Sequence, residues 1–243
     1  MPAWQITKDN LTLLDQIKDV EEGSLRLSAT ALEPATADRV VAFVRKHGNL
    51  LSALRFEPKW RMERWEFGDF DFAKECPSLD ELTLGRCLVH PSVFTHPTLT
   101  ELQLRESKVV GTNEIAIGTR ARGNTGQPLS QVSVGNSFTA KKVVFGKWSK
   151  IRSISWSIDE DCSDATPDDF VCNGCPELRS IHLHACGSWT LDLRGTLPAL
   201  SSMSFDATRY CRYELRTKGL KLDSSPQALA LTPGTFGHNE SDD

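Results

Sequence analysis

The chain has 243 residues, 39% of them hydrophobic and 25% charged, as in an ordinary soluble globular protein. Its net charge of −4 gives no electrostatic support to nucleic-acid binding. No apolar run approaches the roughly 20 residues that a membrane-spanning helix needs. We therefore expect neither a nucleic-acid partner nor a membrane partner.

The N-terminal sequence and the cysteine content indicate a compartment. The first residues, MPAWQITKDN, have neither a basic start nor an apolar core, so they do not read as a secretory signal. An odd number of cysteines, seven, favours free thiols over a disulfide framework. We expect a cytoplasmic protein.

Two helices are predicted near the N-terminus. The first covers residues 10–22, with Asn10 as its N-cap and Gly23 as its stop. The second covers residues 36–47, begins with Thr36 as its N-cap, and carries an apolar stripe along one side. Both helices would cover the first part of the fold.

Segments that follow these helices favour extended structure. Aromatic residues alternate through residues 65–72, and short apolar runs occur at residues 143–145 and 189–193. The side of the fold that carries these segments is therefore predicted to begin helical and to continue as strands.

One sequence motif recurs along the chain. It reads CPSLDELTLGRCLV at residues 76–89 and CPELRSIHLHACGS at residues 175–188. Each copy contains a Leu-x-x-Leu-x-Leu frame with apolar residues at its positions one, four and six, so the last two alternate along a strand and point into a core. Weaker copies lie between and around these two. The predicted strands centre on Leu27, Leu54, Leu82, Leu102, Val132, Ile154, Ile181 and Met203.

This motif resembles the signature of leucine-rich repeat proteins, in which one strand per repeat lines a horseshoe. The resemblance implies an α/β solenoid with a parallel concave sheet, a helical N-terminal part, and short strands or irregular segments on the convex side. It divides the chain into an N-terminal cap (1–23), a repeat array (24–215), and a C-terminal cap with a flexible tail (216–243). The alternative is a set of ordinary strands in a β-sandwich.

Family members act as scaffolds and receptors, so the resemblance implies protein recognition through the concave face. The Cys-Pro opening also looks like the repeats of ubiquitin-ligase substrate receptors, although no F-box precedes the array. A substrate-receptor-like subunit, a pathogen effector and a toxin-neutralising protein are alternatives. Since the sequence holds no nucleophile motif, paired-carboxylate motif or dinucleotide fingerprint, we expect no enzyme and no cofactor; the competing class is an enzyme on an unfamiliar solenoid.

Outward positions on the predicted sheet are the candidate partner-binding residues. On a strand, the residues between the buried ones face the other side. The candidates are Arg55, Glu57, Glu101, Gln103, Arg105, His182 and His184. We expect the arginines, the glutamine and the histidines among them to lie in one stripe, with a protein of unknown identity as the partner.

A zinc site is the alternative for one cluster, formed by Cys172, Cys175, His182, His184 and Cys186. Two of these cysteines occupy the same repeat positions as the cysteines of the first copy, and the histidines should face away from them. We therefore predict no metal.

Three charged segments are each interpreted as structural and not as binding sites. Residues 59–65 combine basic side chains with tryptophans, but nearby glutamates offset the charge. Residues 118–123 are basic and glycine-rich without the ending of a phosphate-binding loop. Residues 159–169 are acidic without the spacing of a calcium-binding loop. We expect a packed segment, a repeat insertion and a solvated loop.

Overall fold

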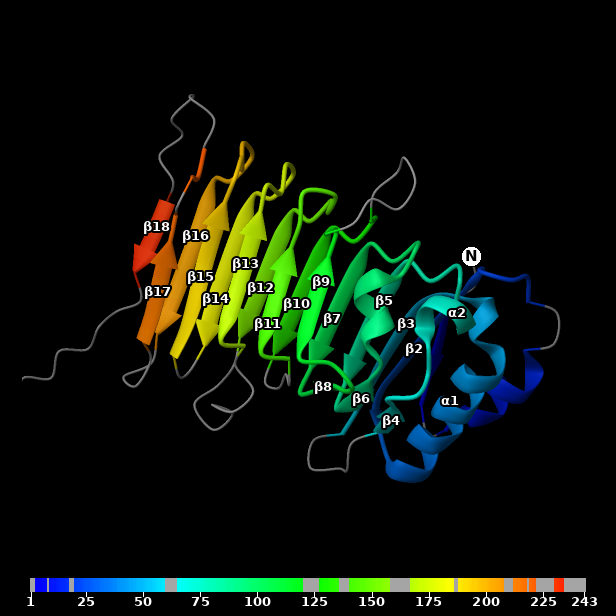
Figure 1. Cartoon of the computed structure of the whole chain (residues 1–243). Coiled ribbons are helices and arrows are strands. Elements are labelled where there is room, and N and C mark those ends of the chain that lie inside the picture. Colours follow the sequence, from blue (N-terminus) through cyan, green and yellow to red (C-terminus); the bar gives the residue numbers. More distant parts are fainter. Residues whose placement is uncertain are drawn as a thin grey trace, which may run out of the picture.

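The protein, seen here as a computed structural model, is mostly β, with its strands in parallel sheets (Figure 1). The structure describes residues 3–7, 9–17, 20–59, 65–119, 127–135, 140–157, 167–185, 188–207, 212–217, 219–221 and 230–233. The expected α/β class is thereby revised, because few helices accompany the strands.

The largest element is a ten-stranded parallel sheet that runs the length of the molecule. In spatial order its strands are β1 (Ala3–Ile6), β2 (Leu25–Leu32), β3 (Leu51–Pro58), β5 (Glu81–Gly85), β7 (Glu101–Arg105), β10 (Gln131–Gly135), β12 (Ser153–Ser157), β14 (Ser180–Ala185), β16 (Ser202–Ala207) and β18 (Ala230–Pro233). The predicted strands centred on Leu82 to Met203 are confirmed as parallel and adjacent in the predicted order.

Two smaller parallel sheets form the opposite wall. One contains β4 (Trp65–Phe67), β6 (Cys87–Val89) and β8 (Lys108–Val109). The other contains β9 (Glu114–Ile117), β11 (Lys142–Phe145), β13 (Asp169–Asn173), β15 (Ser188–Arg194) and β17 (Arg212–Arg216). The chain thus alternates between the large sheet and this wall, which confirms the extended segments predicted at residues 143–145 and 189–193.

Helices occur only in the first half of the described residues. They are η1 (Leu11–Gln16), α1 (Pro34–His47), η2 (Gly48–Leu50), α2 (Phe72–Glu75) and η3 (Pro91–Thr95), where η denotes a 3-10 helix. The predicted change from helices to strands along this side is confirmed. None of these helices has the length and apolarity needed to cross a bilayer.

The helix predicted at residues 36–47 is α1, but it begins earlier. Pro34 occupies its first turn, where a missing N–H costs nothing, and Glu33 takes the N-cap position. Thr36, predicted as the N-cap, is instead buried inside the helix. Its hydroxyl therefore does not cap the helix end.

The helix predicted at residues 10–22 is only the short 3-10 helix η1. The Asn10 side chain does not cap it: its Oδ1 accepts from the Thr7 N–H at 2.7 Å, and its Nδ2 donates to the Gln5 carbonyl at 2.8 Å. These bonds tie η1 back to strand β1.

The prediction of extended structure at residues 65–72 is confirmed only for the first part of the segment. Residues 65–67 form strand β4, but Phe72 begins α2 because the Asp71 carboxylate accepts from the Ala73 N–H at 3.1 Å. Phe70 and Phe72 pack edge to face, with ring centroids 4.8 Å apart. Aromatic packing, and not strand pairing, explains the alternation at this end of the segment.

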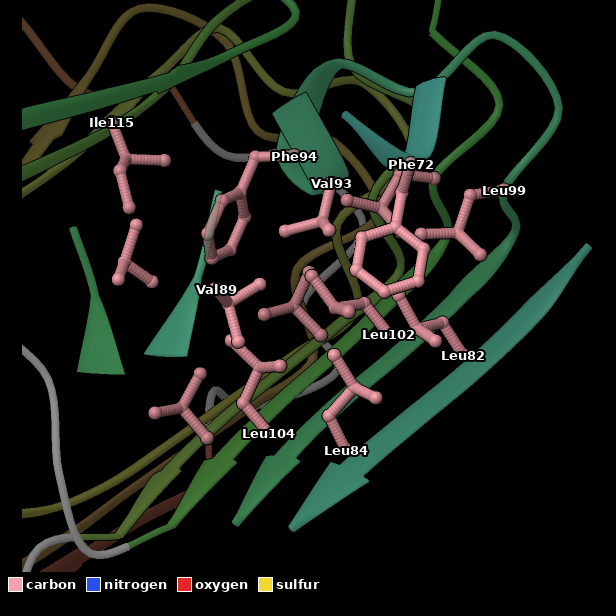
Figure 2. Packing of buried hydrophobic residues seen from close by; sticks show 14 of the residues in the cluster. Phe72, Leu82, Leu84, Val89, Val93, Phe94, Leu99, Leu102, Leu104 and Ile115 are labelled. Atoms are coloured by element: carbon pink, nitrogen blue, oxygen red, sulfur yellow. The ribbon is translucent and has the colours of Figure 1, made fainter. Parts of the chain in front are cut away.

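The core lies between the large sheet and the opposite wall. Leu82, Leu84, Leu102 and Leu104 project from β5 and β7 toward Phe94 and the wall strands (Figure 2). Equivalent apolar residues stand in register from strand to strand, so each turn of chain buries its neighbour's apolar face.

Buried polar side chains join successive turns at a position that the sequence analysis missed. His96, just before a proline, is 1% exposed; its Nε2 lies 3.1 Å from the Phe72 carbonyl and 3.0 Å from the Cys76 carbonyl. Its Nδ1 accepts from the Leu99 N–H at 3.2 Å. These contacts fit the tautomer that carries its proton on Nε2.

Gln127 and Cys175 also precede prolines and have the same role. The Gln127 Nε2 donates to the Phe94 carbonyl, and its Oε1 accepts from the Gly118 N–H at 2.9 Å. The Cys175 thiol donates to the Phe145 carbonyl at 3.3 Å. Each side chain thereby satisfies a backbone group of the preceding turn.

Candidate functional site

The outward positions of the large sheet form three rows that cross the strands, and most of them carry polar side chains. The rows follow from the strand register. The first row is Arg26, Ala53, Glu81, Glu101, Gln131, Ser153, Ser180 and Ser202. The middle row is Ser28, Arg55, Thr83, Gln103, Ser133, Ser155, His182 and Ser204. The third row is Gly85, Arg105, Gly135, Ser157 and His184.

The structure distributes the predicted site residues over these rows, so the expectation of one stripe is wrong. Arg55, Gln103 and His182 share the middle row, whereas Arg105 and His184 share the third. The physical reason is the strand repeat: residues two apart face the same side but lie about 6.6 Å apart along the strand. The remaining two candidates, Glu57 and Glu101, lie beside the third row and in the first row.

Three charged side chains form an Arg55–Glu57–Arg105 cluster. The Glu57 carboxylate accepts from Arg55 Nε at 2.6 Å and lies 2.9 Å from Arg105 Nη1. The Glu57 side chain is 15% exposed, whereas those of Arg55 and Arg105 are 54% and 52% exposed. One partly buried carboxylate therefore holds two accessible guanidinium groups.

Gly85 permits this cluster. Gly85 lies on β5, between β3 and β7, and a Cβ placed on it would stand 3.3 Å from the Glu57 Cα. Because no side chain rises from Gly85, Glu57 and Arg105 meet across the intervening strand. A small residue plays the same part in the first row. There, Arg26 Nη2 lies 2.5 Å from Glu81 Oε2, and the strand between them carries only Ala53 at this position. Sequence reasoning missed Glu81 as a site residue, although its position just before Leu82 marks it as outward.

Two hollows lie on this face and together form what we call the sheet groove. The larger, about 660 Å³, is lined among others by Trp4, Arg26, Arg55, Glu81 and Thr83. The smaller, about 280 Å³, continues over β7, β10 and β12 and shares Glu81 and Thr83 with it. The sheet groove therefore crosses the strands from β1 to β12.

The far half of the face carries hydroxyls and histidines. Ser153 and Ser180 are neighbours in the first row, and the Ser180 Oγ donates to the Ser153 Oγ at 3.0 Å. His182 is exposed and His184 half-buried. Short hydroxyl side chains here allow a partner to approach the sheet closely.

The residues of the alternative zinc cluster are separated. His182 and His184 lie on the outward face, whereas Cys172 and Cys175 are buried on the inner side. Cys186 lies outside the described residues. Within the described part of the chain, no group of three or more potential ligands gathers.

The buried Cys172 and Cys175 thiols influence each other's acidity. Interaction with Cys175, together with burial, raises the pKa of Cys172, whereas interaction with Cys172 lowers the pKa of Cys175. The Cys175 thiol itself donates to the Phe145 carbonyl.

The three charged segments are only partly covered. Residues 60–64, 120–126 and 158–166 lie outside the described residues, so the interpretations of residues 59–65, 118–123 and 159–169 stay predictions. At the edge of the first segment, Lys59 forms an ion pair with Glu33.

Comparisons of the chain with protein-family models, with curated proteins and with solved structures found no match.

Proposed function

We propose that this chain is a leucine-rich-repeat-like solenoid that binds a partner protein through the outward face of its large sheet and performs no catalysis. The observation that carries the proposal is the sheet groove, a polar depression that spans consecutive strands. Extended surfaces of stacked repeats commonly bind other macromolecules.

The repeat assignment is supported by the two Cys-Pro copies and by the register of their strands. Leu82 and Ile181 occupy the same row of the large sheet, although about a hundred residues of sequence separate them. We infer a horseshoe curvature only for the part backed by helices, because a helix is about 10 Å wide and a strand about 4.8 Å.

The character of the face favours a protein partner. The half near β3 and β7 carries ion-paired, half-exposed charges, and the half near β14 carries hydroxyls and imidazoles. Arginine is enriched at binding hot spots, and its truncation there can cost over about 2 kcal/mol of binding free energy. We propose that this partner is met in the cytoplasm, where the chain acts alone or as a substrate-receptor-like or effector subunit of a larger complex.

Site-specific cross-linking tests the proposal. A photo-crosslinking amino acid is placed at Gln103, in the middle row, or at Lys147, on a turn after β11 in the opposite wall. We expect a discrete protein adduct in cells from position 103 and none from position 147. An adduct only from position 147 would place recognition elsewhere.

Affinity measurements with the identified partner follow. Arg105→Ala and His182→Ala should weaken binding and leave the thermal midpoint nearly unchanged, because both side chains are exposed. Lys147→Ala is the control on the opposite wall. Loss of binding in the control, with no effect of the other two changes, contradicts the proposal.

A further inference from the structure

We propose that Arg55 and Arg105 together anchor a carboxylate side chain of the partner, so that the segment lying in the sheet groove is an extended acidic peptide. This inference rests on the proposed function and names the chemistry of the partner.

The charge balance of the cluster supports the inference. Two guanidinium groups share the single carboxylate of Glu57, which leaves one positive charge in excess. Both arginines remain about half exposed, while Glu57 is largely covered. The excess charge is therefore presented to the solvent side, where a ligand arrives.

The space around Arg105 is open on two sides. Its partners in register are Gly85 on β5 and Gly135 on β10, neither of which has a side chain. A carboxylate that approaches from above thus reaches the guanidinium without displacing a neighbour. Because Arg55 binds the same Glu57 carboxylate, an added carboxylate can contact both arginines in the bidentate geometry that makes such pairs strong.

The shape of the site suits an extended chain. Arg55 lines the larger hollow, and the sheet groove continues past Thr83 and Gln103 toward β12. A hydroxyl and an amide both donate and accept, so they can bond the backbone of a segment that crosses the strands. Across the groove, Glu101 repels carboxylates, whereas Glu81 is paired with Arg26 at 2.5 Å, so the uncompensated positive charge lies at the two arginines.

A labelled hexaglutamate peptide is the probe for this site. At low ionic strength we expect saturable binding to the full chain, measured by fluorescence anisotropy. Arg55→Gln or Arg105→Gln should each weaken it on the order of tenfold, since a charged pair is lost. Arg152→Gln, the matched control, removes the same charge from another exposed pair, with Glu177, and should change affinity less than about twofold.

A further variant acts in the opposite direction. Glu57→Gln removes the competing carboxylate and raises the excess charge of the cluster, so we expect tighter peptide binding. Circular dichroism establishes that each variant is folded. Weaker binding by Glu57→Gln, or equal losses from Arg152→Gln and Arg105→Gln, overturns the proposal.

Inorganic phosphate distinguishes a peptide carboxylate from a small anion. Unlabelled hexaglutamate should displace the probe, and phosphate at the same concentration should not. Displacement by phosphate alone would assign a small-anion site instead of a peptide site. These outcomes are separable from the proposed function, because a partner that cross-links at position 103 and loses affinity in His182→Ala but not in Arg105→Gln keeps sheet-face recognition and rejects only the acidic anchor.

Discussion

At the scale of single residues, burial controls the chemistry of the cysteines. Cys76 and Cys87 are both 0% exposed. Desolvation raises the pKa of the Cys76 thiol to about 12 and also raises that of Cys87, so almost no thiolate exists near neutral pH. These thiols pack as small apolar groups and are not reactive sites.

We therefore predict that maleimide at neutral pH leaves Cys76 and Cys87 unlabelled in the native protein. The same residues should react within minutes in denaturant, as mass spectrometry of tryptic peptides would record. Rapid native labelling of Cys76 would contradict its burial in the core.

The buried apolar residues of the large sheet give a second prediction at this scale. Leu183 is 0% exposed, and we expect Leu183→Ala to lower the free energy of unfolding by about 2–5 kcal/mol, because it removes apolar contacts and leaves a cavity. Denaturant titration measures the change. His182→Ala, the neighbouring outward position, is the control and should cost less than about 0.5 kcal/mol.

At the scale of elements, the residue before proline links one turn of chain to the next. His96 bonds the carbonyls of residues 72 and 76, and Gln127 bonds the carbonyl of residue 94. Each bond ties a segment to one 20 to 33 residues earlier, in the preceding turn of chain.

We predict that His96→Leu destabilises the fold by about 1–3 kcal/mol, although leucine fits an apolar core. The reason is that buried carbonyl and N–H groups lose their partner. Thermal unfolding measures the loss. His90→Leu, at a half-buried histidine whose Nδ1 accepts from the Ser92 N–H at 3.2 Å, is the comparison and should cost less. Equal losses of stability in the two variants would mean that the buried hydrogen bonds of His96 contribute no more to stability than the partly buried bond of His90.

At the scale of the whole molecule, stability should fall toward the two ends. Each turn contacts mainly its neighbours, and, among the described strands, β1 and β18 each pair on one side only. We expect amide hydrogen exchange to be slowest in β7, β10, β12 and β14 and fastest in β1 and β18. Mass spectrometry of peptic fragments measures this order. Uniform protection along the chain would indicate a single cooperative unit instead.

The sequence alone determined the strand frame of the large sheet. A buried strand needs apolar residues at alternate positions, and this local pattern marked the strands around Leu82, Leu102 and Ile181 without knowledge of their neighbours. The same pattern identified the outward positions, because they are the alternate ones. It did not place the boundaries of the helices, where Pro34 and the Asp71 side chain decide the first turn.

What the outward residues contact depends on the tertiary structure. Arg26 and Glu81 are 55 positions apart, and the Glu57–Arg105 pair also joins non-adjacent strands, so neither contact follows from local periodicity. The row of each residue depends on strand register, and the clusters depend on Ala53 and Gly85, whose missing bulk matters only once three strands lie side by side. Local pattern fixes which way a side chain points, whereas the stacking of distant turns fixes which groups it meets.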